Sequence, residues 1–256
     1  MNCLFQRAWI DFVHPPPPDR FFRSSGLAGE CPLKYYLDIV APVPPTESRD
    51  ESVLDIGTWV HDDDNWQLRG ANGVPALEQD YYIKLRNPDP KVGEWVVKGS
   101  MDRFRIHPRI GFYIEDIKTK ETLNANKIYQ LLKNSQEISF GFPAYIKQVS
   151  MYAFFEYVYN KRVITRGRIR FISQEDPLFE LAVPIDLMPW TKVQDFILNH
   201  PTIQSCLYHN PQIVIEATRK LHFQPDKFPC SWCDHLPSCP LVKKDPVKEI
   251  PKIKDG

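Results

Sequence analysis

Cysteine placement is the feature that most constrains this chain, because three of its six cysteines stand close together near one end. Cys230, Cys233 and Cys239 have the spacing C-x2-C-x5-C in the segment CSWCDHLPSC. Three clustered thiolates lack one ligand for a closed four-cysteine metal site. Cys31, at the head of the expected helix ECPLKYYL, is the natural fourth. The site would join distant parts of the chain and contribute a stabilisation on the order of 5 kcal/mol.

The ligand types leave the occupant of such a site open, since zinc and iron–sulfur clusters both accept four thiolates. A different ligand set that uses Cys233 and His235 is a further alternative. Cys3 and Cys206 fit no spacing rule, so we interpret them as ordinary thiols. Six cysteines are too few for a disulfide scaffold in a chain of this size, and their uneven placement favours a metal site in a reducing compartment. We therefore expect a cytoplasmic protein.

Length and composition allow one substantial core, with 256 residues, 43% of them hydrophobic and 25% charged. Lys+Arg and Asp+Glu are both 32, so the formal net charge is zero. The strongly basic balance that would argue for nucleic acid by itself is absent, and any DNA contact must use local patches. The sequence has no apolar run long enough for a membrane span and no signal-peptide pattern at its start.

Apolar spacing and proline placement predict an α/β chain with a mixed central sheet flanked by helices. A Pro-rich arm is expected over 1–24, one domain over 25–242 and a basic flexible tail over 243–256. The expected helices begin at Pro32 and cover 54–70, 145–160 and 191–200, and the expected strands cover 79–87, 94–106, 111–121, 162–173 and 177–185.

An acidic–lysine pair lies in the expected strand FYIEDIKTK. Asp116 and Lys118 are two residues apart, so they project from one face of the strand, whereas Glu115 points to the other face. Asp102 lies in the preceding strand, and a short hairpin can bring it beside Asp116. Converging carboxylates suit Mg²⁺ or Mn²⁺, and an adjacent lysine can orient a water or counter charge on a phosphate. For this pair alone, the alternative is a hairpin with a surface salt bridge.

Further motifs surround this pair in a fixed order: G-x-x-x-H, G-x-x-D, D-x-K and Q-x-x-x-Y. This order resembles the RecB-type nuclease family of the PD-(D/E)xK superfamily, over about residues 31–239. Met101 stands where the superfamily pattern has proline before the first aspartate. The matching residues are Gly57 and His61, Gly99 and Asp102, Asp116 and Lys118, and Gln148 and Tyr152.

The resemblance implies a restriction-endonuclease-like core whose metal is bound by His61, Asp102, Asp116 and the backbone carbonyl of Ile117. Lys118 would act on the nucleophile or the phosphate. Gln148 and Tyr152 would order the site or touch DNA. Two of these residues have simpler alternatives: a surface or capping role for His61 beside the acidic run that follows it, and a place in the core for Tyr152.

One cysteine before the nuclease motifs and three after them resembles the iron–sulfur subset of this family. That subset includes the CRISPR-associated RecB-like exonucleases and the AddB-type nuclease domains. The resemblance implies that a structural [4Fe-4S] cluster, rather than zinc, is held by the four cysteines. It also implies a Mn²⁺- or Mg²⁺-dependent DNA exonuclease acting on single-stranded DNA or DNA with free ends, in CRISPR adaptation, recombination or phage DNA processing.

Three arginines alternate along one expected strand and can track phosphates: Arg166, Arg168 and Arg170. A solvated sheet face is the alternative for each of them. Two other function classes stay open beside the nuclease. One is a DNA-binding subunit of a larger complex, with a weak nuclease site, which the neutral net charge and the Pro-rich arm favour. The other is a zinc-clamped structural adaptor with fortuitous acidic residues.

Overall fold

The computed structural model describes residues 10–12, 20–43, 79–85, 94–107, 109, 111–120, 142–175, 180–221, 230 and 233–242. The chain divides into two compact units. One comprises Met1–Glu47, Tyr82–Lys98 and Gln194–Gly256, and the other comprises Ser48–Tyr81 and Gly99–Val193. Among the described residues, none of the helices combines the length and apolar character needed to cross a bilayer.

A mixed four-stranded sheet with the strand order β1-β3-β4-β2 lies mostly in the first unit, while residues 79–81 and 99–101 of its two central strands belong to the second. Its strands are β1 (Ile10–Phe12), β2 (Phe21–Arg23), β3 (Gln79–Leu85) and β4 (Trp95–Met101). β1 is antiparallel to β3, and β2 is parallel to β4. In the core of this unit Phe22 stacks on Trp95, with ring centroids 4.6 Å apart.

The expectation of a simple Pro-rich arm therefore misses two strands. The run of prolines at positions 15–18 falls between β1 and β2 in the sequence and interrupts neither strand. Prolines outside a strand remove no hydrogen bond from its sheet. The Pro-rich composition therefore hid two strands whose pairing it does not prevent.

Four helices lie in the first unit, and the last three of them begin at sequence signals: α1 (Ser24–Ala28), α2 (Pro32–Val40), α7 (Pro201–Leu207) and α8 (Pro211–Lys220). The last three each have proline at the first helical position, where its missing N–H costs nothing. The residue before each proline caps the helix: Cys31, His200 and Asn210 accept a backbone N–H through their side chains.

α2 packs against both α7 and α8. The buried Thr202 hydroxyl donates to the carbonyl of Pro32 at 2.8 Å, which ties the starts of α7 and α2 together. Leu33, Tyr36 and Leu37 are buried on α2, as their spacing predicted. α6 (Trp190–Leu198) confirms the expected helix near its predicted bounds, whereas α7 and α8 were not predicted.

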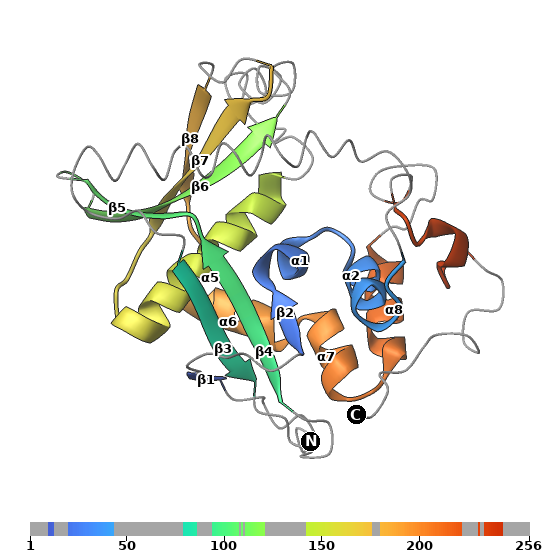
Figure 1. Cartoon of the computed structure of the whole chain (residues 1–256). Coiled ribbons are helices and arrows are strands. Elements are labelled where there is room, and N and C mark those ends of the chain that lie inside the picture. Colours follow the sequence, from blue (N-terminus) through green and yellow to red (C-terminus); the bar gives the residue numbers. More distant parts are fainter. Residues whose placement is uncertain are drawn as a thin grey trace. The chain divides into compact units, whose positions relative to one another are not determined.

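The second unit holds a second mixed sheet, with the order β5-β6-β7-β8 (Figure 1). Its strands are β5 (Arg103–His107), β6 (Gly111–Lys120), β7 (Arg166–Ser173) and β8 (Glu180–Asp186). β6 is antiparallel to β5 and parallel to β7, and β8 is antiparallel to β7. The chain is thus a mixed α/β protein with two mixed sheets, where one central sheet was expected.

The single strand expected over 94–106 is broken at Asp102. β4 ends at Met101 in one sheet, and β5 begins at Arg103 in the other. The apolar residues Trp95, Val97 and Met101 occupy odd positions in β4, whereas Phe104 and Ile106 occupy even positions in β5. The alternation therefore changes phase at Asp102, and this shift is the signal of the break that the single expected strand overlooked. The break leaves Asp102 at a junction between two strands instead of inside one.

The helix α5 (Phe142–Asn160) packs on β6 and β7 (Figure 1). Gly99 of β4 lies directly against this helix. A Cβ atom added at Gly99 would stand 2.3 Å from Cε2 of Phe155 and 3.2 Å from Cε1 of Tyr152. The glycine of the G-x-x-D motif is therefore explained by the close approach of strand and helix.

Candidate functional site

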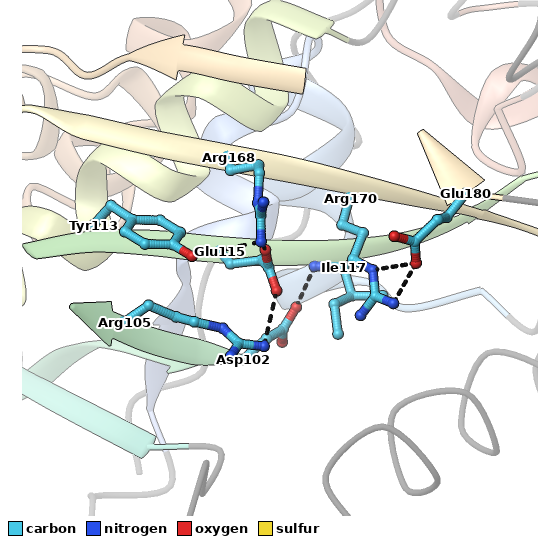
Figure 2. A network of polar contacts seen from close by, with 8 residues as sticks. All are labelled: Asp102, Arg105, Tyr113, Glu115, Ile117, Arg168, Arg170 and Glu180. Carbon is cyan, nitrogen blue, oxygen red and sulfur yellow. Dashed lines mark hydrogen bonds and ion pairs between the residues drawn. The ribbon is translucent and has the colours of Figure 1, made fainter. Parts of the chain in front are cut away.

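The candidate catalytic residues of the second unit gather where β5 and β6 begin to separate. Asp102, at the strand junction, accepts a hydrogen bond from the backbone N–H of Ile117 through Oδ2, at 2.7 Å (Figure 2). Asp116 precedes Ile117 on β6, so the hairpin brings the two aspartates to adjoining positions, as the sequence predicted. Figure 2 shows the Asp102 carboxylate reaching across to the backbone of β6.

Asp116 is fully buried, and neither of its carboxylate oxygens accepts a hydrogen bond from any residue that the structure describes. Nζ of Lys118 lies 2.9 Å from Asp116 Oδ2. This contact is an ion pair by distance, but its geometry is not that of a hydrogen bond. A buried carboxylate without hydrogen bonds is costly to maintain. The two oxygens, one of them paired with Lys118, are of the type that a hard divalent cation prefers.

Lys118 is the positive group of this cluster. Burial is the largest single influence on its pKa and lowers it, but Asp116, Asp102 and Tyr145 each raise it, and the net pKa of Lys118 lies above its usual value. Its ammonium also lies 5.6 Å from the centroid of the Tyr145 ring. Lys118 is therefore a stable cation, suited to countering negative charge and unsuited to acting as a base.

α5 supplies the other side chains near this cluster. The amide nitrogen of Gln148 donates to the hydroxyl of Tyr152 at 2.5 Å. Tyr152 is buried against Gly99, and Gln148 is partly exposed. Tyr145, three residues before Gln148 and so on the same helix face, was missed in the sequence. It lies over Lys118 and packs edge-on against Phe171, with ring centroids 6.0 Å apart.

The opposite face of β6 carries a second charged cluster around Glu115. This fully buried carboxylate forms ion pairs with Arg168 and with Arg105, whose Nη2 lies 3.4 Å from Glu115 Oε1 (Figure 2). Arg168 also stacks over Tyr113, with its guanidinium carbon 5.4 Å from the ring centroid. The prediction that Glu115 and Asp116 point to opposite faces of the strand is confirmed, because they pair with different cations on different faces.

The three arginines proposed as phosphate contacts each face a carboxylate. Arg166 lies 3.9 Å from Asp186, Arg168 pairs with Glu115 and Arg170 pairs with Glu180. The side chain of Arg166 is 61% exposed, and those of the other two are less exposed. A role in DNA contact stays a prediction for all three.

His61 lies outside the residues that the structure describes, so its predicted place in the metal site stays a prediction. Within the described ranges, no three or more His, Cys, Asp or Glu side chains are grouped closely enough to hold a metal ion. The described part of the candidate site thus contributes two carboxylates, Asp102 and Asp116, and the ammonium of Lys118.

The first unit brings the four predicted cysteine ligands to one pocket. Cys31 caps the start of α2, and the other three lie in the C-terminal segment that includes the short 3-10 helix η3 (Leu236–Ser238). The pocket is lined by Cys31, Leu33, Lys34, Leu37, Thr218, Cys230, Cys233, His235, Leu236, Cys239 and Leu241. Residues about two hundred positions apart in the sequence therefore line one pocket, although within the described ranges their thiols are not grouped closely enough to hold a metal ion as they stand.

Two of these thiols accept backbone hydrogen bonds. The N–H of Lys34 donates to Cys31 Sγ at 3.4 Å, and the N–H of His235 donates to Cys233. Burial raises the pKa of Cys31 to about 11, assisted by the three other cysteines and opposed by the Lys34 bond. Burial likewise raises the pKa of Cys233. Metal binding at this pocket must therefore displace protons from the thiols.

Comparison with known proteins leaves the family open. No family model matches the chain, and no curated protein matches its sequence. Among solved structures, the crystal structure of SSO0001 is similar at 12% identity and a TM-score of 0.49, covering 90% of each chain. An alkaline exonuclease from Laribacter hongkongensis is similar at 11% identity and a TM-score of 0.41, covering 78% of this chain and 92% of its own. At these scores, the case for a function rests on the residues themselves.

Proposed function

We propose that this protein is a metal-dependent deoxyribonuclease that hydrolyses phosphodiester bonds as an exonuclease, on single-stranded DNA or DNA with free ends. The observation that carries the proposal is Asp116: a buried carboxylate with two oxygens that accept no hydrogen bond from the described residues, beside Asp102 and Lys118. Proteins normally satisfy buried carboxylates with hydrogen bonds. A buried carboxylate without such bonds, at the aspartate of the D-x-K motif, supports a cation site.

The residues present fit a hard divalent cation. Asp102 and Asp116 would hold Mn²⁺ or Mg²⁺, and the resemblance adds His61 and the carbonyl of Ile117. The Ile117 N–H already fixes Asp102 at 2.7 Å, so the carboxylate is oriented before any ligand arrives. A divalent cation at such a site supplies Lewis acidity and lowers the pKa of a bound water.

The remaining side chains orient the reactants. Lys118, a cation held by its neighbours, would counter the charge that develops on the scissile phosphate or orient the attacking water. Tyr145 limits the positions open to the Lys118 ammonium. The bond from Gln148 to Tyr152 fixes the Gln148 amide, which is partly exposed and able to contact the DNA backbone.

We further propose that the four cysteines hold a [4Fe-4S] cluster, with zinc as the alternative occupant. Support comes from the convergence of all four thiols on one pocket and from the order of motifs that resembles the iron–sulfur subset of RecB-type nucleases. The cluster would be structural: it would join α2 to the C-terminal segment within the first unit. CRISPR adaptation, recombination and phage DNA processing remain the proposed settings, with proteins of the first two pathways as possible partners.

The nuclease proposal is tested with anaerobically purified protein and single-stranded DNA labelled at either end, incubated with Mn²⁺, Mg²⁺ or EDTA. We expect degradation that requires the divalent cation and is abolished in Asp116→Asn and in Lys118→Met. The matched control is Asp186→Asn, which neutralises an 89% exposed carboxylate on the same sheet and should leave the rate unchanged. Circular dichroism of each variant checks that it is folded.

Intact DNA in every reaction, from folded wild-type protein with its metal content measured, would contradict the nuclease proposal. Tight DNA binding in that case would favour the DNA-binding subunit instead. Cleavage that survives Asp116→Asn would show that the activity resides elsewhere. Iron, sulfide and zinc analysis of the same preparation tests the cluster proposal separately, since neither substitution touches the cysteine pocket.

A further inference from the structure

A chain of polar contacts runs beside the cysteine pocket and joins its two halves. Asp38 on α2 receives the Lys34 ammonium at Oδ2, at 2.9 Å, and lies 2.8 Å through Oδ1 from Nε2 of His235. His235 belongs to the C-terminal cysteine segment and is almost completely buried, with 2% of its surface exposed. One carboxylate therefore links α2 to the segment that carries three of the four cysteines.

Both partners of Asp38 also donate a backbone hydrogen bond to a cysteine of the pocket. The Lys34 N–H donates to Cys31, and the His235 N–H donates to Cys233. A shift of either backbone would misalign one of these N–H···S bonds. The contacts of Asp38 are thus coupled to the hydrogen bonds of two thiols, Cys31 on α2 and Cys233 in the C-terminal segment.

We propose that Asp38 is a positioning residue of the cysteine site, holding Lys34 and His235 so that their backbone amides bond the sulfurs of Cys31 and Cys233. The inference rests on the proposed metal occupancy of the four cysteines, but the contacts themselves exist without a metal. It also assigns a role to His235: its Nε2 is engaged by Asp38, so the ring is held in one orientation and any metal bond from it would use Nδ1.

The physical reason is that groups bonded to metal ligands control how firmly a metal is held. Removing such partners typically lowers metal affinity by roughly 10- to 100-fold. Hydrogen bonds to the sulfurs and the local net charge also set the reduction potential of an iron–sulfur cluster. Loss of the Asp38 charge should therefore make reduction easier, which raises the midpoint potential.

The test uses the full chain, purified anaerobically, as wild type, Asp38→Ala and Asp38→Asn, with Glu216→Ala as a matched control. Glu216 is an exposed carboxylate on α8 that does not line the pocket. We measure iron and sulfide per chain, the rate of absorbance loss in a chelator and the midpoint potential. If zinc is the occupant, its release to a colorimetric chelator replaces the optical measurement.

We expect metal loss from Asp38→Ala to be about 10- to 100-fold faster than from the wild type. Asp38→Asn keeps an acceptor for His235 and should rescue most of the retention, while its midpoint potential still rises because the charge is gone. Glu216→Ala should match the wild type. If Asp38→Ala retains its metal as long as the wild type and has the same midpoint potential, the proposal is overturned, even where the wild type carries a full cluster.

A metal-free measurement separates this inference from the cluster proposal. In apo protein, Asp38→Ala should speed alkylation of Cys233 and Cys239, because the C-terminal segment loses its bond to α2. The buried Cys206 serves as an internal reference that should not change. A wild type without iron or zinc would refute the cluster proposal alone. Equal alkylation rates in the apo wild type and apo Asp38→Ala would refute the positioning role.

Discussion

Replacing Gly99 by alanine tests whether the motif glycine is required for steric reasons. The added Cβ would lie 2.3 Å from Cε2 and 3.0 Å from Cδ2 of Phe155, a fully buried ring that stacks on Tyr81 with centroids 5.7 Å apart. Contacts this short do not occur in folded proteins, so the Phe155 ring or the strand must move. The ring has little room because Tyr152 is also within 3.2 Å of the new methyl group.

The magnitude follows from two opposing contributions. Overpacking a well-filled core costs about 1–3 kcal/mol. Alanine also restricts the unfolded chain and returns about 0.4–1 kcal/mol. We therefore expect Gly99→Ala to lower the free energy of unfolding by about 1–2 kcal/mol, measured by urea denaturation followed by circular dichroism.

A double-mutant cycle identifies the clash as the cause. Phe155→Leu alone should destabilise the protein by creating space. In the combined variant the methyl group at position 99 enters that space, so the total loss should fall short of the sum of the single losses by about 0.5–3 kcal/mol. A Gly99→Ala variant as stable as the wild type, or strictly additive losses, would refute the steric explanation.

Three further outcomes are expected. Glu115→Gln should lower the free energy of unfolding by about 3 kcal/mol, because it leaves Arg105 and Arg168 without their buried partner. Urea denaturation measures this loss, and a loss below about 1 kcal/mol, typical of exposed ion pairs, would contradict the prediction. Burial raises the pKa of Tyr36 from 10.0 to about 12, so the folded state keeps this proton at pH values where the unfolded state loses it. The free energy of unfolding should therefore fall as the pH rises from 10 towards 12. Urea denaturation at a series of pH values should show a shallower fall in Tyr36→Phe than in the wild type. Removing the proposed metal of the cysteine pocket with a chelator should lower the free energy of unfolding by an amount on the order of 5 kcal/mol, measured by thermal unfolding. Cys31→Ser should abolish the difference between treated and untreated protein.

Local patterns predicted most of the described elements near the candidate site. Alternation along FYIEDIKTK correctly assigned Asp116 and Lys118 to one face of β6 and Glu115 to the other. Helical spacing correctly predicted α5 and placed Gln148 and Tyr152 on one face of it, where the structure shows a hydrogen bond between them. These predictions succeed because side-chain direction in a strand or helix depends on the local backbone repeat alone.

Other elements were missed because their local signals are short. α7 and α8 are short helices that begin after His200 and Asn210, and their capping residues and prolines could have revealed them, but each has only a few apolar positions. The N-terminal strands β1 and β2 were hidden by neighbouring prolines. A three-residue strand is defined by its partner strand more than by its own sequence, which is why propensity gives it little weight.

The sequence by itself determined the chemistry that is available: the spacing of the cysteines, the D-x-K pair and the helix that carries Gln148. Only the tertiary structure decided which of these groups meet. It ended one strand at Met101 and began the next at Arg103, which freed Asp102 to bond Ile117. It also buried Asp116 without a hydrogen bond from the described residues, beside Lys118, and bonded His235 to Asp38. Such contacts join residues distant in sequence, and their energies depend on burial and exact distance, which no local pattern encodes.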